Sequence, residues 1–547
     1  EPGHTKAGAK PDWLQARIRS NAKATASAAF FYGKEGALCE CYHSTGWSAT
    51  LQDAKLIADG LLLAGIRYLV PHGFFYTTHA LKKHDAPPTF FYQMPFWPFF
   101  GELSAHVERI ARAFEGTHID AEILVVDPGG GLLTHEDPAN HPYLQAYEDL
   151  LWALMREHLD YHIVDTDILA EAVVVGGRVR AAGVAARVVV VPAMQVVEPS
   201  LATWLADFTA AGGIVVWCAV DEPARFIVGR VRQVIHPSLS LRLGDVEAGD
   251  ILCVKRMGGD RTLWFCLNVG AESRTVTLDA GVRLRELPLD GPARLEWVDG
   301  YARRAVAPFE SFLVEAEGDQ AADNAVLLPV VHVPISGQAK VVSLDANLLR
   351  LGTWSLSLRQ PDGRWGAPAM VAAVPLANQL SDSGLPFAPR FHHTFGHVPE
   401  LSLPEITARY VGSFHNAFDG PVELVMEPGS IVGDWEIVVN DMVRLTAADF
   451  APTSAHVRGS LGADVARAMR PGANTLVVTV TTDRMDGGLL NPLYLAGPFG
   501  VTLSPLGLTP SATEGQFEDY VGNRLPFYAG RIEYQTVFHL ASMPEAK

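Results

Sequence analysis

The sequence predicts a multidomain protein in which two α/β regions precede two all-β regions. The chain has 547 residues, several times the usual size of a domain, so a single hydrophobic core is not expected. Up to about residue 243, apolar runs of strand length alternate with amphipathic stretches of period near 3.6, whereas beyond it the period falls to 2. With 48% hydrophobic and 19% charged residues, the composition excludes a disordered chain.

Residues 1–116 alternate between strand and helix patterns. The clearest helix pattern, residues 51–63, carries an apolar stripe, with Lys55 and Asp59 on its polar side and Gly65 at its end. Strands joined by connections of helix length predict a parallel sheet covered by helices. The expected helices are 12–26, 51–63 and 99–114, and the expected strands are 28–32, 36–42 and 66–76.

Residues 117–243 repeat this pattern more regularly and predict an open α/β domain of flavodoxin-like or amidotransferase-like type. The glycine run 129–131 lacks the spacing of a phosphate-binding loop. Cys218 ends a strand without the glycine turn expected around a nucleophile, so we expect a buried structural residue. The expected strands are 121–126, 161–164, 188–191 and 214–217, and the expected helices include 143–158 and 200–211.

The remaining chain predicts two β-sandwiches, because short alternating segments are separated by turn residues. The first is a small all-β domain, residues 244–320, and the second spans residues 321–547. The expected strands are 262–269, 274–278, 284–287 and 312–315 in the first, and 405–414, 422–426, 435–439 and 475–480 in the second.

The charge and hydropathy of the chain restrict its partners. Lys and Arg number 43 against 61 Asp and Glu, a net charge of −18, and the basic residues are not clustered. We therefore expect neither a nucleic acid nor an anionic membrane as partner. No apolar run approaches the length of a membrane span, so we expect a soluble protein. The chain starts at Glu1 without a signal segment, so we expect that the natural start has been lost, and the sequence assigns no compartment.

The cysteine and histidine spacing favours no metal and no cofactor. The five cysteines contain no Cys-x-x-Cys pair, and the His-x-x-x-His pairs at 158/162 and 393/397 have no cysteine near them. Neither a structural zinc site nor a disulfide framework is therefore expected. Acidic turns such as Asp483 to Asp486 leave a structural calcium ion open.

The strand around Glu40 carries the strongest chemical signal. Because side chains alternate along a strand, Cys39 and Cys41 share one face and Glu40 lies on the other. If helices cover the cysteine face, Glu40 points into a barrel interior near the carboxyl end of the strand, where barrel enzymes carry their active sites. The structural alternative is a salt-bridged or edge-strand carboxylate.

The segments that follow Glu40 are rich in aromatic and histidine residues. Flat aromatic faces together with hydrogen-bonding groups suit a sugar, so His72 and Tyr76 are candidate substrate contacts. Packing under a long loop is the alternative for most of the aromatic residues, and a satisfied structural group is the alternative for His72. The aromatic residues are Phe90, Phe91, Tyr92, Phe96, Trp97, Phe99 and Phe100.

Three segments, residues 28–34, Cys39-Glu40 with Gly46-Trp47, and residues 70–76, resemble the closing strands of the catalytic barrel in large multidomain glycoside hydrolases. The pattern is similar to the family 106 α-L-rhamnosidases and to enzymes like the family 42 β-galactosidases. In the latter, a barrel is followed by a flavodoxin-like domain and a small β domain. Toward the C-terminus, residues 405–414, 435–440 and 471–476 resemble the jelly-roll sugar-binding-type domain of family 2 enzymes.

The resemblance implies a fold and an activity. Residues 1–116 would be the C-terminal part of a (β/α)₈ catalytic barrel, and residues 321–547 a jelly-roll, galactose-binding-like sandwich. The chain would be a glycoside hydrolase acting on a terminal sugar of a plant or microbial glycan or glycoside, with Glu40 as nucleophile or general base. The expected substrate contacts are Tyr42, His43, Trp47, His72, Tyr76 and Asp85.

The resemblance also implies a missing part. Only two or three of eight barrel strands fit before residue 118, and the general acid should come from an earlier strand. We therefore expect an N-terminal polypeptide that completes the barrel, because open sheet edges are costly. Asp85 and Glu102 are the candidate acids within the chain. A non-catalytic carbohydrate-binding or assembly subunit is the alternative, and the sugar, the anomer and the stereochemical outcome stay open.

Overall fold

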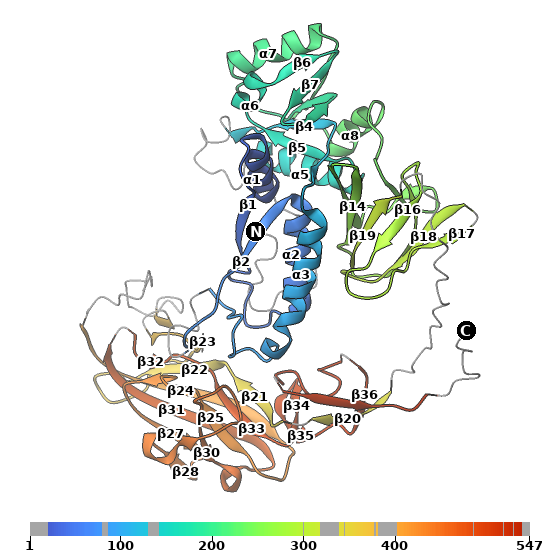
Figure 1. The fold of residues 1–547 in the computed structure, drawn as a ribbon. Helices are drawn as coiled ribbons and strands as arrows, with labels where there is room; N and C mark the ends of the chain where they lie inside the picture. The colour runs from blue at the N-terminus through green and yellow to red at the C-terminus, as the bar shows by residue number, and fades with distance from the viewer. Residues whose placement is uncertain are drawn as a thin grey trace. The chain divides into compact units, whose positions relative to one another are not determined.

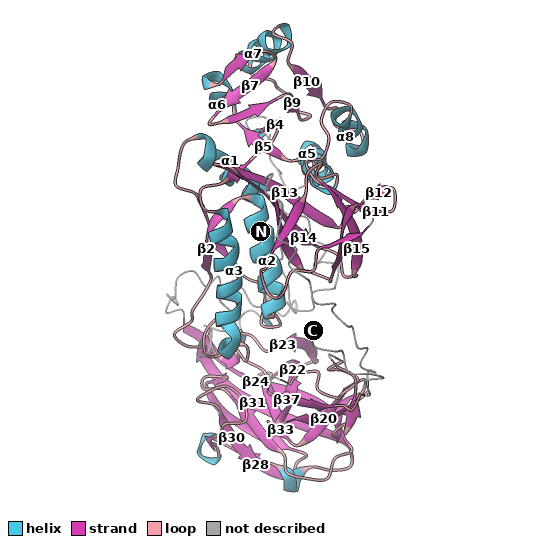
Figure 2. Ribbon diagram, turned by 45° about the vertical axis from the view of Figure 1, so that its right-hand side comes forward, coloured by secondary structure: helices cyan, strands magenta, loops and turns pink. Residues whose placement is uncertain are grey.

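The computed structural model describes residues 20–78, 86–129, 142–298, 300–317, 338–343, 345–376, 379–380, 402–484, 486–517, 519–528 and 530–538. The chain forms two compact units (Figure 1). The first comprises residues 1–74 with 86–326, and the second comprises residues 75–85 with 327–547. Strands outnumber helices in the described residues, and nearly all helices belong to the first unit (Figure 2).

The first unit begins with a small parallel sheet packed on helices. β1 and β2 pair in parallel, with Glu40 opposite Val70 and Cys41 opposite Pro71. α2 begins at a capping box formed by Thr50 and Asp53 and ends at Gly65, whose φ of 104° suits glycine. The elements are α1 (Ser20–Phe31), β1 (Ala37–Cys41), α2 (Leu51–Ala64), β2 (Ile66–Pro71), η3 (Trp97–Phe99) and α3 (Phe100–Phe114).

One expected strand of this region is wrong. Residues 28–31 belong to helix α1, so segment 28–34 is not a barrel strand, and the sheet formed by β1 and β2 has two strands in the described residues. The run is rich in alanine, the strongest helix former, and Phe30 anchors it by stacking on the rings of His118 and His162 at 5.3 and 5.1 Å. A short run of alanine followed by aromatic residues is therefore compatible with a strand as well as a helix.

The two faces of the β1–β2 sheet differ sharply. Ala37, Cys41 and Ile66 are buried in a core shared with α2, α3 and strands of the following sandwich. On the opposite face, Leu38 and Val70 are exposed although they are apolar. Parallel sheets are normally covered on both faces, so this face is unusual, and it is the face that carries Glu40.

The next part of the first unit has a four-stranded parallel sheet in the order β10-β9-β4-β5. Its strands lie within two residues of the sequence prediction, and three match it residue for residue. A second, antiparallel sheet, β6-β7-β8, was not expected. The elements are β4 (Ile123–Val126), α5 (Pro142–Arg156), β5 (Tyr161–Val164), α6 (Thr166–Glu171), β6 (Val173–Val175), β7 (Arg178–Ala181), β8 (Val184–Ala186), β9 (Val188–Val191), α7 (Pro199–Ala210), β10 (Ile214–Trp217) and α8 (Ala224–Arg232).

The first unit ends in a sandwich of two five-stranded sheets, ordered β12-β11-β15-β18-β17 and β16-β19-β14-β13-β3. Their inner faces form one apolar core around Trp264 and Phe312. The strands are β3 (His118–Ile119), β11 (Ser240–Leu243), β12 (Val246–Glu247), β13 (Ile251–Gly258), β14 (Arg261–Asn268), β15 (Arg274–Asp279), β16 (Leu284–Leu287), β17 (Glu296–Val298), β18 (Tyr301–Val306) and β19 (Ser311–Ala316).

The second unit is built from strands. A five-stranded sheet (β21-β33-β25-β30-β29) and an eight-stranded sheet containing β24 and β31 enclose its core, and β36-β20-β37 form a smaller sheet. The strands are β20 (Ala339–Ser343), β21 (Asn347–Leu351), β22 (Thr353–Leu358), β23 (Ala369–Ala372), β24 (Ser402–Asn416), β25 (Glu423–Met426), β26 (Ile431–Val432), β27 (Asp434–Val439), β28 (Val443–Leu445), β29 (Ala451–Pro452), β30 (Leu461–Asp464), β31 (Gly472–Arg484), β32 (Gly488–Leu489), β33 (Leu493–Gly497), β34 (Phe499–Leu503), β35 (Leu506–Pro510), β36 (Glu514–Gly515) and β37 (Ile532–Gln535).

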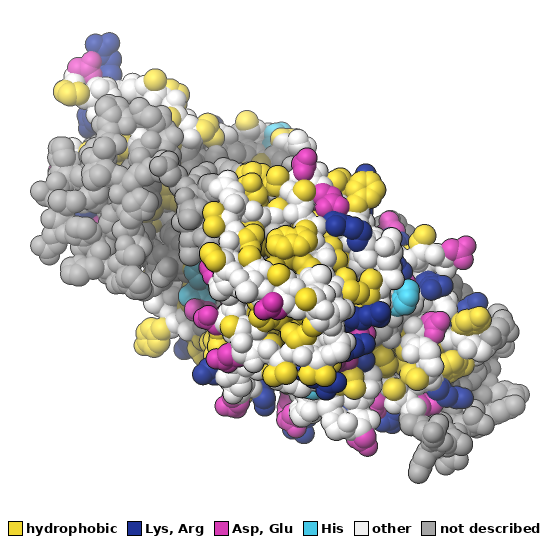
Figure 3. All heavy atoms as spheres, turned by 90° about the horizontal axis from the view of Figure 1, so that it is seen from above, with side chains coloured by type: hydrophobic (Ala, Val, Ile, Leu, Met, Phe, Trp, Pro, Cys, Tyr) yellow, Lys and Arg dark blue, Asp and Glu magenta, His cyan; other side chains and the backbone are white. Residues whose placement is uncertain are grey.

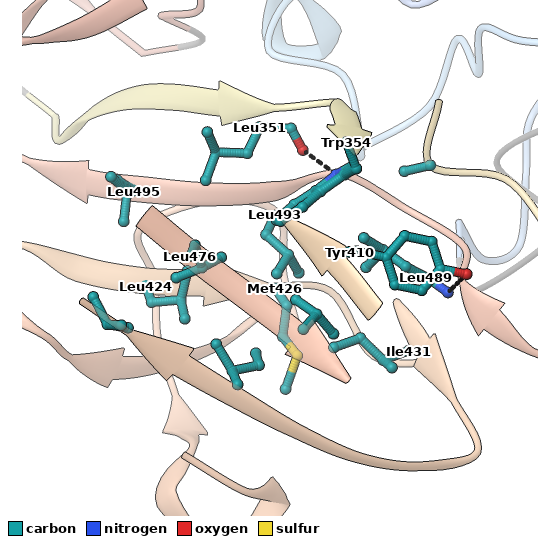
Figure 4. Packing of buried hydrophobic residues seen from close by; sticks show 14 of the residues in the cluster. Leu351, Trp354, Tyr410, Leu424, Met426, Ile431, Leu476, Leu489, Leu493 and Leu495 are labelled. Carbon is teal, nitrogen blue, oxygen red and sulfur yellow. Dashed lines mark hydrogen bonds between the residues drawn. The ribbon is translucent and has the colours of Figure 1, made fainter. Parts of the chain in front are cut away.

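Two large aromatic side chains organise this core (Figure 4). Trp354 is fully buried and donates its indole N–H to the carbonyl of Leu351 at 3.2 Å. Tyr410 is also fully buried, and its hydroxyl lies 3.5 Å from the backbone nitrogen of Leu489 and donates to Gln379 at 2.9 Å. Burial of these polar tips is tolerated because each has a partner.

The surface and the helices agree with parts of the sequence analysis. On the face drawn in Figure 3, acidic and basic side chains are mixed among hydrophobic ones. In the described part of the chain, every helix falls short of the length and apolar character that crossing a membrane requires. The limits 116, 243 and 320 of the four expected domains remain predictions.

Candidate functional site

Glu40 lies near the carboxyl end of β1, on the exposed face of the two-stranded sheet. Its side chain is 63% exposed. Alternation along the strand explains this position, because Cys39 and Cys41 turn toward the core side as expected. The helices α2 and α3 contribute to that core. Glu40 is therefore held on a rigid element while its carboxylate stays accessible.

His72 is the neighbour of this carboxylate. Its Nδ1 lies 2.9 Å from Oε1 of Glu40. The contact follows from the strand register, because His72 comes directly after Pro71, the partner of Cys41, and its backbone N–H donates to the carbonyl of Cys41 at 2.8 Å. Glu40 and His72, which are far apart in sequence, are thus brought together because the parallel pairing of β1 and β2 continues by one backbone hydrogen bond.

The turn after β1 presents His43 to this pair. The rings of His43 and His72 have centroids 4.8 Å apart, and His43 Nδ1 lies 2.8 Å from the hydroxyl oxygen of Ser44. Tyr42 and Ser44, on either side of His43, have φ values of 73° and 58°. Non-glycine residues in this left-handed region cost free energy and occur often at functional sites.

The structure separates the other expected substrate contacts. Tyr42 is buried against Phe90, with ring centroids 4.7 Å apart, and burial raises the pKa of its phenol well above the usual value. Its side chain is therefore withdrawn from the face that carries Glu40. Trp47 is partly exposed in the same turn region, and Tyr76 is 93% exposed. Asp85 lies outside the described residues.

The aromatic segment divides between core and surface. Phe90 is fully buried, as predicted for most of this segment, whereas Tyr92 and Phe99 are exposed. Phe74, two residues after His72, is half exposed and contacts three aromatic rings edge-on. The sequence analysis did not single out Phe74, although its position beside His72 was a usable signal. The rings that it contacts belong to Phe91, Trp97 and Phe100, with centroids 5.7, 6.1 and 5.8 Å away.

Glu102, the second candidate acid, belongs to a different site. It lies in the first turn of α3 and lines a cleft of about 750 Å³ between α2, α3 and the sandwich, whose lining does not include Glu40. At this cleft, the buried His106 has Nε2 2.7 Å from Asp59 Oδ1 and Nδ1 2.7 Å from Asp290 Oδ2. Lys55, Asp290 and Arg304 in this lining are each paired with another charged group. We therefore assign the cleft a structural role and keep the candidate site at Glu40.

Asp59 corrects the sequence analysis of helix 51–63. The periodicity predicts Asp59 on the polar side of this helix, but its side chain is fully buried. Its carboxylate accepts hydrogen bonds from Lys55 and lies against His106, both at 2.7 Å. A carboxylate can be buried when it has such partners, and helical periodicity alone cannot reveal a partner on another element.

The described residues hold no group of three or more His, Cys, Asp or Glu side chains that could bind a metal ion. In the acidic turn near residue 483, Asp486 accepts two hydrogen bonds from Arg484, so its charge is already paired. The absence of a cofactor and the structural calcium ion remain predictions. Cys218 is partly buried, and burial raises the pKa of its thiol to about 12, which favours a structural residue over an activated nucleophile.

Known proteins offer distant similarity. No family model matches the chain, and no curated protein matches it. Among solved structures, it is similar to a rhamnosidase from Novosphingobium sp. PP1Y, at 17% identity and a TM-score of 0.40, over 87% of this chain and 49% of that one. A β-galactosidase from Bacillus circulans sp. alkalophilus matches at 13% identity and a TM-score of 0.37, over 49% of this chain and 52% of that one.

A β-galactosidase from Rahnella sp. R3 matches at 11% identity and a TM-score of 0.37, over 55% of this chain and 58% of that one. The chain thus spans about half the length of these structures, all of which are glycoside hydrolases.

Proposed function

We propose that the chain is part of a glycoside hydrolase in which Glu40 acts on the anomeric carbon of a terminal sugar. The observation that carries the proposal is the carboxylate of Glu40, exposed near the carboxyl end of a parallel strand and hydrogen-bonded to His72 at the end of the neighbouring strand. This is the position at which enzymes with parallel α/β sheets place reacting groups. Phe74 and His43 supply an aromatic surface and a polar group of the kind that sugars use.

Glu40 would act in one of two ways. In a retaining enzyme it would attack the anomeric carbon and form a covalent glycosyl intermediate, and in an inverting enzyme it would remove a proton from the attacking water. Both mechanisms need a second carboxyl group, about 5–5.5 Å away in the first case and about 6.5–9.5 Å away in the second. The contacts of Glu40 with the described residues include His72 and no second carboxyl group.

We propose that another polypeptide segment supplies this acid together with further strands. The exposed apolar residues Leu38 and Val70 support such a partner, because a covering layer would bury them. In the described residues, β1 and β2 pair only with each other, so each strand has one open edge. Added strands would satisfy the backbone hydrogen-bonding groups at these edges. The rhamnosidase or β-galactosidase type of activity belongs to this proposal as well.

A carbohydrate-binding subunit without turnover is the second candidate. The lack of a second carboxyl group among the described contacts of Glu40 favours it. Binding of the same sugar by the wild-type protein and by Glu40→Gln, without product release by either, would support this candidate.

The test compares Glu40→Gln with wild type on a panel of aryl glycosides, in the presence of any polypeptide that co-purifies. We expect a loss of activity of at least about 1,000-fold with an unchanged melting temperature, because the amide keeps the shape and loses the reacting charge. Glu35→Gln is the matched control, since Glu35 precedes the same strand and accepts a hydrogen bond from Tyr68. A Glu40→Gln enzyme that kept more than about a tenth of the wild-type rate would exclude Glu40 from the mechanism.

The partner segment has its own test. We expect the chain expressed alone to release no aryl group and to expose apolar surface, measured by binding of a hydrophobic dye, and we expect co-expression with the barrel-completing segment to reverse both. Leu38→Lys in the co-expressed pair should weaken the association at least tenfold, because a buried unpaired charge is costly. Full glycosidase activity of the chain as an isolated monomer would contradict the proposal that a partner segment is required.

A further inference from the structure

We infer that His72 is a positioning residue that engages one oxygen of Glu40 and thereby directs the other oxygen to the reacting sugar or water. This inference rests on the proposed function. It assigns the histidine to the protein's own carboxylate, whereas the sequence analysis treated His72 as a contact to the substrate.

The geometry identifies the donor in this pair. An ionised carboxylate has only acceptor oxygens, so the proton between Glu40 Oε1 and His72 Nδ1, which are 2.9 Å apart, belongs to the imidazole. His72 must therefore carry its proton on Nδ1 whenever the contact exists with an ionised carboxylate. The structure in this way assigns a tautomer that can be observed directly.

An exposed glutamate needs such a contact to act reproducibly. With 63% of the side chain exposed, the carboxylate has little packing to restrict its torsion angles, and catalysis requires the reacting atom in a narrow range of positions. Hydrogen bonding through Oε1 fixes the plane of the carboxylate and leaves Oε2 for the reaction.

His72 is itself held from three sides. Its backbone N–H continues the ladder to the carbonyl of Cys41 at 2.8 Å, and the next residue, Gly73, accepts a hydrogen bond from the N–H of Phe90 at 2.8 Å. The ring of His43 lies 4.8 Å from the ring of His72, and Ser44 holds His43 through the 2.8 Å contact to its Nδ1. The strained turn at Tyr42 and Ser44 therefore has a function: it places His43 against His72.

Two substitutions separate positioning from simple packing. His72→Asn keeps a donor N–H close to the place of Nδ1, whereas His72→Leu fills similar space without a donor. We expect kcat to fall about 100-fold in His72→Leu with KM nearly unchanged, because a misplaced reacting group costs about this factor, and we expect His72→Asn to recover most of the loss. Tyr68→Phe is the control, since it removes a hydrogen bond from β2 to the carboxylate of Glu35, which precedes β1, and its kcat should stay within about twofold of wild type.

A second measurement does not depend on activity. In ¹⁵N spectra of the histidine rings, we expect one resonance pair typical of an Nδ1–H tautomer that is absent in His72→Asn and changes to the Nε2–H pattern in Glu40→Leu. Equal kcat values for His72→Leu and His72→Asn, or an Nε2–H tautomer of His72 in the wild type, would overturn the inference. If the tautomer is as expected but no glycoside is cleaved, the positioning contact stands and the proposed function fails.

Discussion

Among the histidine–carboxylate contacts of the described residues, two of similar length, Glu40–His72 and Asp59–His106, lie in very different surroundings. Glu40 and His72 are 63% and 29% exposed, whereas Asp59 and His106 are 0% and 3% exposed. The exposed pair is accessible to a substrate, and an exposed pair contributes little to the stability of the fold. The buried pair joins helices α2 and α3, and through Asp290 it also joins the sandwich. The same two kinds of group therefore differ in burial: under the proposed function the exposed pair serves reactivity, whereas the buried pair holds elements together.

The charges around His106 show why the buried contact holds the structure. Burial lowers the pKa of His106, but hydrogen bonds to Asp290 and Asp59 outweigh burial, so that the pKa is raised overall. Burial would also raise the pKa of Asp290, but its hydrogen bonds with His106 and Arg109 hold that pKa well below the usual range. The Lys55 ammonium group bonds the other oxygen of Asp59. Each charged group in this cluster is thus stabilised by an oppositely charged neighbour.

The largest effect is expected from a substitution in the buried pair, Asp59–His106. Asp59→Ala removes the partner of two buried or half-buried cations, and removing one member of a buried ion pair costs about 3–5 kcal/mol. Glu40→Gln, in contrast, should change the free energy of unfolding by less than about 0.5 kcal/mol, as is usual for an exposed position. Denaturant unfolding of both variants measures the difference. Equal stabilities would show that Asp59 is not part of a cohesive cluster.

Sequence patterns predicted this architecture well where local rules apply. The strands 161–164, 188–191 and 214–217 were found because buried parallel strands are short continuous apolar runs. The placement of Glu40 on the face opposite Cys39 and Cys41 followed from alternation along one strand. The helix at 28–31 was missed because a run of alanine and phenylalanine suits both periods, and its packing on His118 decided the outcome.

Features that depend on distant contacts could not be predicted. Asp59 meets His106 and Asp290, which come from another helix and from the sandwich, and no local pattern encodes such a meeting. The contact of Glu40 with His72 required the register of β1 against β2, which is a property of the folded sheet. The burial of Tyr42 required the left-handed turn, which turns this side chain toward Phe90.

A smaller effect should appear as a function of pH. Because the pKa of His106 is raised in the folded protein, the folded state binds the proton more tightly. The stabilisation is fully present below the unfolded-state pKa of about 6.5 and is lost as the pH rises through the folded-state pKa. Unfolding free energies measured from pH 6 to 9 should therefore fall with pH more steeply in wild type than in His106→Asn.

The comparison of wild type with His106→Asn is needed because other groups also titrate between pH 6 and 9. Burial lowers the pKa of Lys23 to about 8 and raises that of Asp160 to about 7. Lys23 makes stability rise with pH above about 8, and Asp160 makes it fall with pH up to about 7. Both contributions cancel in the comparison with His106→Asn. Parallel pH curves for the two proteins would contradict the assignment to His106.

The smallest effect is expected from a substitution near the exposed pair, Glu40–His72. Phe74→Ala removes a half-exposed aromatic ring two residues after His72 and leaves Glu40 and its hydrogen bond in place, so we expect KM to rise about tenfold with kcat nearly constant. A tenfold change corresponds to about 1.4 kcal/mol, within the range of one aromatic contact. Phe99→Ala is the matched control, because Phe99 is also exposed but is not among the ring contacts of Phe74. A loss of kcat in Phe74→Ala, or an equal rise of KM in Phe99→Ala, would show that Phe74 supports the fold of the loop instead of binding the sugar.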